Sequence, residues 1–370
     1  MMRRSNGIDA LRAAVTLLVV FHHTAITYGA IGGWYYKELP PSETPTGLLL
    51  IFFCTVNQAW FMGLFFLLAG YYTPASCEKR GIREFIRERL IRLGIPLLVY
   101  FLVLHPVTVA IAEIARGHSF LSTLEDAYRH RKFEPGPLWF AEALLIFTSV
   151  WLVVYVSICG AAKRDKQPFP SNLTFLVAPL LTGAAAFLLR LIWPVGVNVA
   201  FLQLGYFASY VVLFAAGCVA WKNRWLERIP ESQSRLWLRI AYLAIPVFPV
   251  IAIYAAVTKV VAGPNEGGWN VLAALYAFWE PFVAWGTILG LLVYFERRFA
   301  ILNLFWKRLT RRAYLIYIIH PPILVGVALI WRSVDAPALL KFFVTGAVGC
   351  GLCYLAAGLL LRLRIVERVV

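Results

Sequence analysis

The segment Ile8–Thr24, IDALRAAVTLLVVFHHT, is an apolar stretch with helical character that carries an acid, an arginine and two histidines. Arg12 and His23 are 11 positions apart. In a helix this places both side chains on one face, about 16 Å apart along the axis. Asp9 lies about 40° from His23 around the axis, and His22 about 100° away. Because ionisable groups inside a membrane segment are costly, Asp9, Arg12 and His23 predict a functional site; the alternative is a structural ion pair plus a hydrogen-bonded histidine.

The composition around this segment is that of a membrane protein. Of the 370 residues, 61% are hydrophobic and 15% are charged, and the mean hydropathy is +0.72. A soluble domain is about half apolar and a quarter charged. We therefore predict an all-α, polytopic transmembrane helix bundle with about ten spans, which forms a single domain over residues 1–370. The predicted spans are 8–29, 47–72, 93–115, 137–158, 172–193, 202–220, 238–258, 270–295, 313–331 and 337–361, the second of them broken near Asn57–Gln58.

The net charge of +16 follows the membrane topology. With the N-terminus inside, the inner segments hold 25 Lys and Arg residues and the outer loops hold 7. Such a bias predicts that both termini are cytoplasmic and that the basic residues face anionic lipid. Nucleic-acid binding is therefore not expected.

An arginine cluster follows the second span. In CEKRGIREFIRERLIRLGIPLL, Arg89 and Arg92 are three residues apart and lie side by side on a helix at the inner mouth of the third span. Two guanidinium groups in this arrangement suit a phosphate-rich ligand. The alternative is ordinary positive-inside charge in contact with lipid headgroups.

Further ionisable residues lie within the predicted spans. Glu142 follows the interfacial Trp139 by one turn, and Glu280 and His320 lie next to prolines, where irregular helices can line a cavity. We expect these four residues to line a cavity, although several intramembrane charges could form buried pairs. Arg190 is expected to extend its charge towards the outer surface. The polar loop 116–136 is either part of an outer entrance or a solvated loop.

Metal and redox chemistry are not expected from the cysteines. Cys350 and Cys353 form a CxxC pattern, but it lies in an apolar span rich in small residues. That setting favours helix packing over metal or redox chemistry, so no metal site is predicted.

Several of these stretches together resemble the acyltransferase 3 family of integral membrane acyltransferases. The first span resembles the family's motif of an acidic residue and Arg followed by ten residues and His. Ala69-Gly70-Tyr71 stands where the family usually has Ser-Gly-Phe, and this variant, in FFLLAGYY, resembles the branch that includes glucan succinyltransferases. The stretches that carry the resemblance are IDALRAAVTLLVVFHH, WFMGLFFLLAGYY, FIRERLIRLGIPLL, GPLWFAEALL and AYLIYIIHPPILV.

The resemblance implies transfer of an acyl group from cytoplasmic acyl-CoA to a hydroxyl of a carbohydrate or similar acceptor at the outer face. An acetyl or succinyl donor is expected. In this scheme His23 is the general base, with His22 as its rival. Arg89 and Arg92 would bind the phosphates of the donor, Arg12 would hold the donor along its path, and Asp9 would orient Arg12.

A second class of function stays open from the residues alone. A ten-span protein with intramembrane Asp, Arg, Glu and His could be a proton-coupled transporter or flippase. Against this, no inverted repeat is visible and the arginine pair would have no role. A purely structural scaffold would not need the Asp9–Arg12–His23 face. The expected location is the cytoplasmic (inner) membrane of a bacterial cell, with lipid, acyl-CoA and a glycan as partners.

Overall fold

The computed structural model describes residues 5–159, 166–258, 264 and 266–369, and no β-sheet occurs among them. Ten helical segments of this described part are long and apolar enough to cross a membrane, which confirms the predicted all-α, multi-span fold. These segments are Asn6–Thr27, Pro45–Arg80, Ile82–Arg116, Gly136–Ser157, Asn172–Ile192, Leu204–Asn223, Glu231–Ala255, Val271–Arg298, Leu304–Ile330 and Ala338–Leu360.

The helices fall into two compact units, each built from separated stretches of chain. Unit 1 comprises residues 1–55, 88–142 and 299–370, and unit 2 comprises residues 56–87 and 143–298. The prediction of a single domain over residues 1–370 stays a prediction. Unit 1 holds α1 (Asn6–Thr27), α4 (Ile95–Val99), α5 (His105–Glu113), α6 (Phe120–Arg129), α13 (Leu304–Ile330), α14 (Ala338–Leu360) and α15 (Arg364–Val369). Unit 2 holds α8 (Asn172–Ile192), α9 (Phe207–Asn223), α10 (Glu231–Ala244), α11 (Val247–Thr258) and α12 (Val271–Arg298). Three helices contribute residues to both units: α2 (Pro45–Arg80), α3 (Ile82–Arg89) and α7 (Trp139–Val154).

Helix α2 is continuous, so the predicted break near Asn57–Gln58 is wrong. In unit 2, Gln58 Nε2 donates a hydrogen bond to Tyr210 Oη of α9 over 3.2 Å. A neighbouring helix therefore satisfies this amide, and the backbone does not have to unwind to do so.

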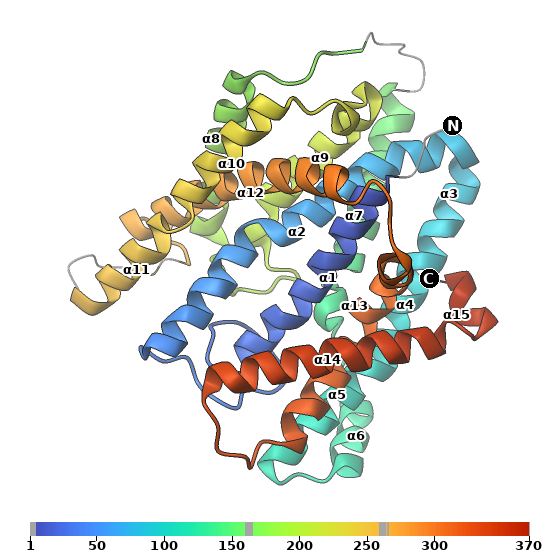
Figure 1. Cartoon of the computed structure of the whole chain (residues 1–370). Helices are drawn as coiled ribbons and strands as arrows, with labels where there is room; N and C mark the ends of the chain where they lie inside the picture. The colour runs from blue at the N-terminus through green and yellow to red at the C-terminus, as the bar shows by residue number, and fades with distance from the viewer. Residues whose placement is uncertain (1–4, 160–165, 259–263, 265, 370) are drawn as a thin grey trace. The chain divides into compact units, whose positions relative to one another are not determined.

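In unit 1, α13 packs against both α1 and α14 (Figure 1). Small residues allow the close approach of α14 to its neighbours, since a Cβ added at Gly346 would clash with the ring of Phe21. Cys353 is completely buried in this core, and both Cys350 and Cys353 are free thiols. The predicted role of the CxxC stretch in helix packing agrees with this arrangement.

The third span contains two π-helical turns, at Leu90–Gly94 and at Tyr100–Leu104. Each turn ends just before a proline, Pro96 and Pro106 respectively. A proline has no backbone N–H and its ring crowds the carbonyl four residues earlier, so an α-helix widens or bends at such a point.

Tyrosine hydroxyls donate hydrogen bonds to the carbonyls that receive none from these prolines. Tyr314 Oη donates to the Arg92 carbonyl over 2.7 Å, and Tyr128 Oη donates to the Leu102 carbonyl over 2.6 Å. Both carbonyls lie four residues before a proline. The prolines of this span thus create acceptors that tie it to α13 and α6.

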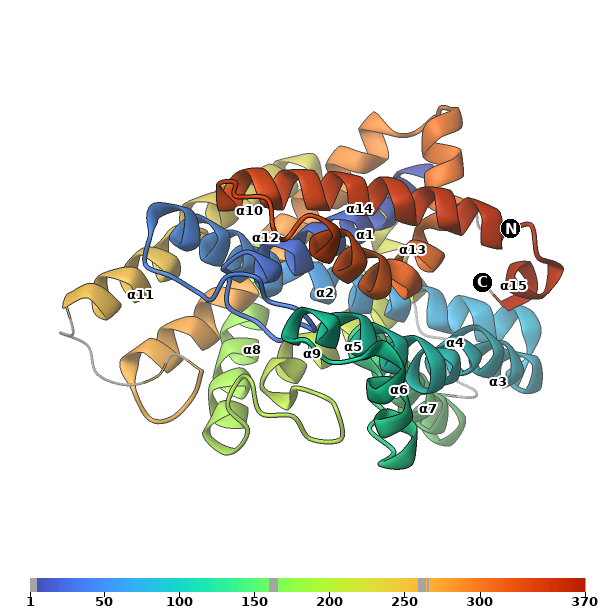
Figure 2. The same ribbon diagram turned by 90° about the horizontal axis from the view of Figure 1, so that it is seen from below.

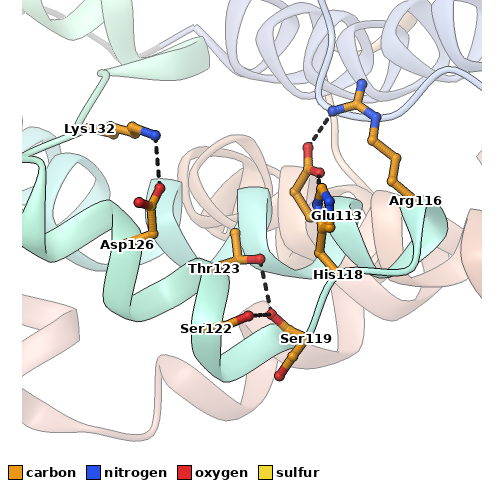
Figure 3. Close-up of polar contacts among 8 residues, drawn as sticks. All are labelled: Glu113, Arg116, His118, Ser119, Ser122, Thr123, Asp126 and Lys132. Atoms are coloured by element: carbon orange, nitrogen blue, oxygen red, sulfur yellow. Dashed lines mark hydrogen bonds and ion pairs between the residues drawn. The ribbon is translucent and has the colours of Figure 1, made fainter.

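The predicted polar loop 116–136 contains helix α6, which packs against α5 (Figure 2). Surface contacts hold the link between these helices and the segment that follows α6, as Figure 3 shows. Glu113 binds both Arg116 and His118, and Lys132 Nζ lies 2.8 Å from Asp126 Oδ2. The hydrogen bond from Lys132 lowers the pKa of Asp126. Because these side chains are exposed, the contacts order the loop at little gain in stability.

In unit 2, α12 packs against α8 and α10 (Figure 1). Its central charge, Glu280, forms an ion pair with Arg190 of α8, and the two residues are 4% and 1% exposed. The expectation that Arg190 extends towards the surface is therefore wrong. A buried partner of opposite charge lies within reach, which removes the need to expose the guanidinium group.

Candidate active site

His23 of α1 and His320 of α13 meet in unit 1. The Nδ1 atom of His23 lies 2.9 Å from the Nε2 atom of His320, and the two rings are nearly parallel. His320 is fully buried, whereas His23 is partly exposed. Two residues that were singled out separately in the sequence therefore form one hydrogen-bonded pair.

A backbone carbonyl fixes the protonation of this pair. His320 Nδ1 lies 2.7 Å from the carbonyl oxygen of Tyr317. In a regular helix that carbonyl would accept from the N–H of residue 321, but Pro321 has none. The proline thus makes the carbonyl available to the histidine one position before it.

The direction of each hydrogen bond follows from this contact. A carbonyl oxygen only accepts, so Nδ1 of His320 carries the proton and donates it. The Nε2 atom of neutral His320 is then an acceptor, and His23 donates to it from Nδ1. His23 Nε2 is left with its lone pair, and it makes no hydrogen bond within the described residues. This tautomer is the one that a general base requires.

The indole of Trp34 covers one face of His23. The ring centroids are 4.1 Å apart and the planes differ by 8°. The Nε1 atom of Trp34 is buried and has no hydrogen-bond partner in the described part of the chain. Trp34 lies in the connection between α1 and α2, which is anchored by a buried ion pair between Glu38 and Lys341 of α14.

The ring of Tyr35, the residue after Trp34, meets the Trp34 ring edge-on at 5.3 Å. Tyr35 Oη and Tyr100 Oη are 2.9 Å apart, and the Tyr35 ring lies 5.6 Å from the ring of His105. Burial raises the pKa of Tyr35, so its hydroxyl stays protonated at neutral pH. A Cβ at Gly136, where φ is +49°, would collide with Tyr35 Oη, so only glycine fits this turn.

The two other predicted members of the first-span site lie near the opposite end of α1. Arg12 Nη1 is 3.8 Å from Asp9 Oδ1, as expected for partners three residues apart. Arg12 is exposed, with 46% of its side chain accessible. His22, the rival base, is buried, and its ring meets that of His23 edge-on at 5.7 Å.

The arginine pair lies at the start of the third span. Arg92 is exposed and binds Glu88 over 3.2 Å, while Arg89 is partly buried at the end of α3. In unit 2, a cavity of about 520 Å³ is lined by Arg80, Arg83 and Arg87. Neither Arg89 nor Arg92 is among the lining residues of this cavity, so the predicted phosphate contact of that pair stays a prediction.

The four residues expected to line a cavity each have contacts within their own unit, and the cavity itself stays a prediction. His320 pairs with His23, and Glu280 belongs to the ion pair of unit 2. Trp139 and Glu142 lie in the first turn of α7; Trp139 packs beside Phe140, and Glu142 has a buried oxygen, Oε2, without a partner among the described residues. Groups of three or more His, Cys, Asp or Glu residues that could hold a metal ion are absent from the same described ranges.

Two features of the site were missed in the sequence. Trp34 stands in WYY at residues 34–36, an aromatic run in a connecting loop that could have been noticed. The contact between His23 and His320 spans 297 positions of the chain, and no local pattern predicts it. The Tyr-x-x-His-Pro spacing of residues 317–321 does hold the signal for the tautomer.

Comparison with known proteins places this chain in a family. The model of the acyltransferase domain family matches residues 5–358. The proteins named "Glucans biosynthesis protein C" from Escherichia coli O1:K1 / APEC and from Escherichia coli O9:H4 (strain HS) are each 24% identical over 156 residues. These matches cover 40% of this chain and 39% of each relative. No solved structure matches the chain significantly. The family model covers nearly the whole chain, so the chain belongs to the acyltransferase domain family, and the ten apolar helical segments of its described part are those of a multi-pass membrane protein.

Proposed function

We propose that this protein transfers an acetyl- or succinyl-class group from acyl-CoA to a hydroxyl of a carbohydrate, with His23 as the general base. The donor binds from the cytoplasm and the acceptor from the outer face of the cytoplasmic membrane. The single observation that supports this most directly is the chain of hydrogen bonds from His23 through His320 to the Tyr317 carbonyl. It leaves a lone pair on Nε2 of a partly exposed histidine.

The chemical step needs this lone pair. The acceptor oxygen attacks the thioester carbonyl carbon while His23 Nε2 takes the hydroxyl proton. The carbonyl π electrons move to oxygen and form a tetrahedral oxyanion. When the carbonyl bond forms again, the C–S bond breaks, and the thiolate of CoA receives the proton from His23.

His320 acts through His23. Its Nε2 accepts the hydrogen bond from His23 Nδ1, which holds the ring and the tautomer of the base in place and stabilises the imidazolium that forms when His23 Nε2 is protonated. His320 is therefore a positioning residue. This role favours His23 as the base over His22, because the hydrogen bond to His320 is made by His23.

The donor side of the proposal rests on cationic groups. Arg89 and Arg92 would bind the phosphates of CoA, since guanidinium groups match phosphate oxygens in geometry and charge. Arg12 lies about three helical turns, or about 16 Å, from His23 along α1. Its exposed side chain would steady the extended donor, with Asp9 beside it as an orienting partner.

The acceptor class is suggested by the relatives. A name that refers to glucan biosynthesis favours a glucan or a similar glycan as the hydroxyl donor. His23 lies one turn before the end of α1, close to the aromatic run 34–36. Aromatic side chains provide flat faces for sugar rings, so this end of the helix suits a glycan.

The test is acyl transfer in membranes that contain wild type, His23→Ala or His118→Ala. Each is supplied with labelled acetyl-CoA or succinyl-CoA and a glucan acceptor, at equal amounts of folded protein. His118 is the matched control, because it is an exposed histidine bound to Glu113 away from the pair. We expect His118→Ala to match wild type and His23→Ala to be about 10²- to 10⁴-fold slower. Equal rates for His23→Ala and wild type would refute the proposed base.

A further inference from the structure

We infer that Trp34 is a catalytic residue whose indole N–H donates a hydrogen bond to the oxyanion that forms during acyl transfer. This inference rests on the proposed function, because the oxyanion exists only if acyl transfer takes place beside His23. The proposed site then has two parts: His23 takes the proton of the acceptor hydroxyl, and the Trp34 N–H stabilises the carbonyl oxygen of the acyl donor.

The position of Trp34 is the first support. Its ring lies parallel to His23 with 4.1 Å between the centroids, and within 5.8 Å of His320. In acyl transfer the oxygen whose proton goes to the base and the developing oxyanion are both bonded to the same carbon. A hydrogen-bond donor that stabilises the oxyanion therefore has to lie within a few ångströms of the base, as this indole does.

The second support is the unpaired donor. The Nε1 atom of Trp34 is buried and lacks a partner among the described residues. Buried tryptophan N–H groups nearly always have one, since an unpaired donor costs about 1–3 kcal/mol. Stacking on His23 alone would need only a phenyl ring. The unpaired indole N–H beside the base would find its acceptor in an oxygen atom of the bound substrate.

The third support is that the local structure fixes this ring. The loop that carries Trp34 is tied to the end of α1 by hydrogen bonds from the backbone N–H groups of Glu38 and Leu39 to the Thr27 carbonyl. The Glu38 carboxylate binds Lys341, which is buried in α14. An oxyanion donor needs such a fixed position, because its benefit comes from pre-organisation.

Trp34→Phe tests the inference, because phenylalanine keeps the stacked ring and removes only the N–H. The matched control is Trp331→Phe, which removes an indole N–H that already has a partner, Thr345 Oγ1 at 3.0 Å. Both variants are assayed for kcat, KM and melting temperature beside His23→Ala. We expect Trp34→Phe to lose about 10²- to 10³-fold in kcat with little change in KM or melting temperature. Trp331→Phe should keep the kcat of wild type and lose some stability.

The outcomes separate the two proposals. If kcat of Trp34→Phe stays within about tenfold of wild type, the inferred donor is wrong, because such a loss is too small for an oxyanion contact. If the variant loses activity only in proportion to lost folded protein, Trp34 has a packing role and the inference is also overturned. In either case an inactive His23→Ala leaves the proposed base intact and an active His23→Ala refutes that base, whereas wild type that transfers no acyl group from either CoA ester refutes the proposed function itself.

Discussion

Glu280→Gln is expected to destabilise unit 2 without acting on the reaction. The substitution leaves the guanidinium of Arg190 charged and 1% exposed in the core. Breaking a buried ion pair by removing one partner costs about 3–5 kcal/mol. Three contacts of Arg190 remain, namely Nε to the Gly205 carbonyl at 2.9 Å and the faces of Tyr276 at 4.6 Å and Tyr206 at 5.5 Å.

These remaining contacts set the expected size of the loss. A cation over an aromatic face and a hydrogen-bonded carbonyl both stabilise the unpaired charge, and glutamine keeps the volume of the lost side chain. We therefore expect the lower end of the range, about 3 kcal/mol. This corresponds to about a hundredfold change in the unfolding equilibrium constant.

Equilibrium unfolding of purified protein in detergent micelles measures this difference. The control is the double substitution Arg190→Met with Glu280→Met, which removes both charges and should recover most of the loss. A Glu280→Gln protein whose free energy of unfolding stays within about 0.5 kcal/mol of wild type would refute the reasoning. A double variant no more stable than Glu280→Gln would do so as well, since the unpaired charge would not be the cause.

Three further substitutions test other parts of the account. Pro321→Ala supplies an N–H that competes with His320 for the Tyr317 carbonyl, so turnover should fall by about 3- to 10-fold at constant KM. The control, Pro322→Ala, should change turnover less. Equal effects of the two substitutions would contradict the role of the carbonyl. Lys341→Met leaves the Glu38 carboxylate without its ion-pair partner, which should speed proteolytic cleavage of the loop between α1 and α2. An unchanged cleavage rate would show that this ion pair does not anchor the loop. Gly70→Ala places a Cβ against the backbone of α9 and should lower the free energy of unfolding by about 1–3 kcal/mol, whereas the Cβ of Gly351→Ala meets open space and should leave it unchanged. Denaturant titration compares the two variants. Equal stabilities would argue against close packing of α2 on α9.

Much of the fold could be predicted because a bilayer restricts the choices. A chain that crosses lipid must satisfy its backbone internally, so long apolar stretches become helices, and the number of spans follows from their length. The errors fall on polar residues inside those stretches. Gln58 forms a hydrogen bond with Tyr210, and Arg190 forms an ion pair with Glu280. Both partners are distant in sequence.

The candidate site shows the same division. The common face of Arg12 and His23 follows from helical periodicity, which is a local property. The pairing of His23 with His320 depends on how α1 packs against α13, and the stacking of Trp34 depends on the path of a loop. Neither can be derived from spacing along the chain, although the proline after His320 marks where a carbonyl becomes available.

A double-substitution cycle on His23 and His320 tests the central claim most directly. Turnover is measured for wild type, His23→Ala, His320→Ala and the double variant, at matched amounts of folded protein. If His320 acts through His23, the double variant should be no slower than His23→Ala, since the base that His320 positions is already gone. Losses that multiply in the double variant would show that the two histidines act independently, and this would contradict the proposed relay.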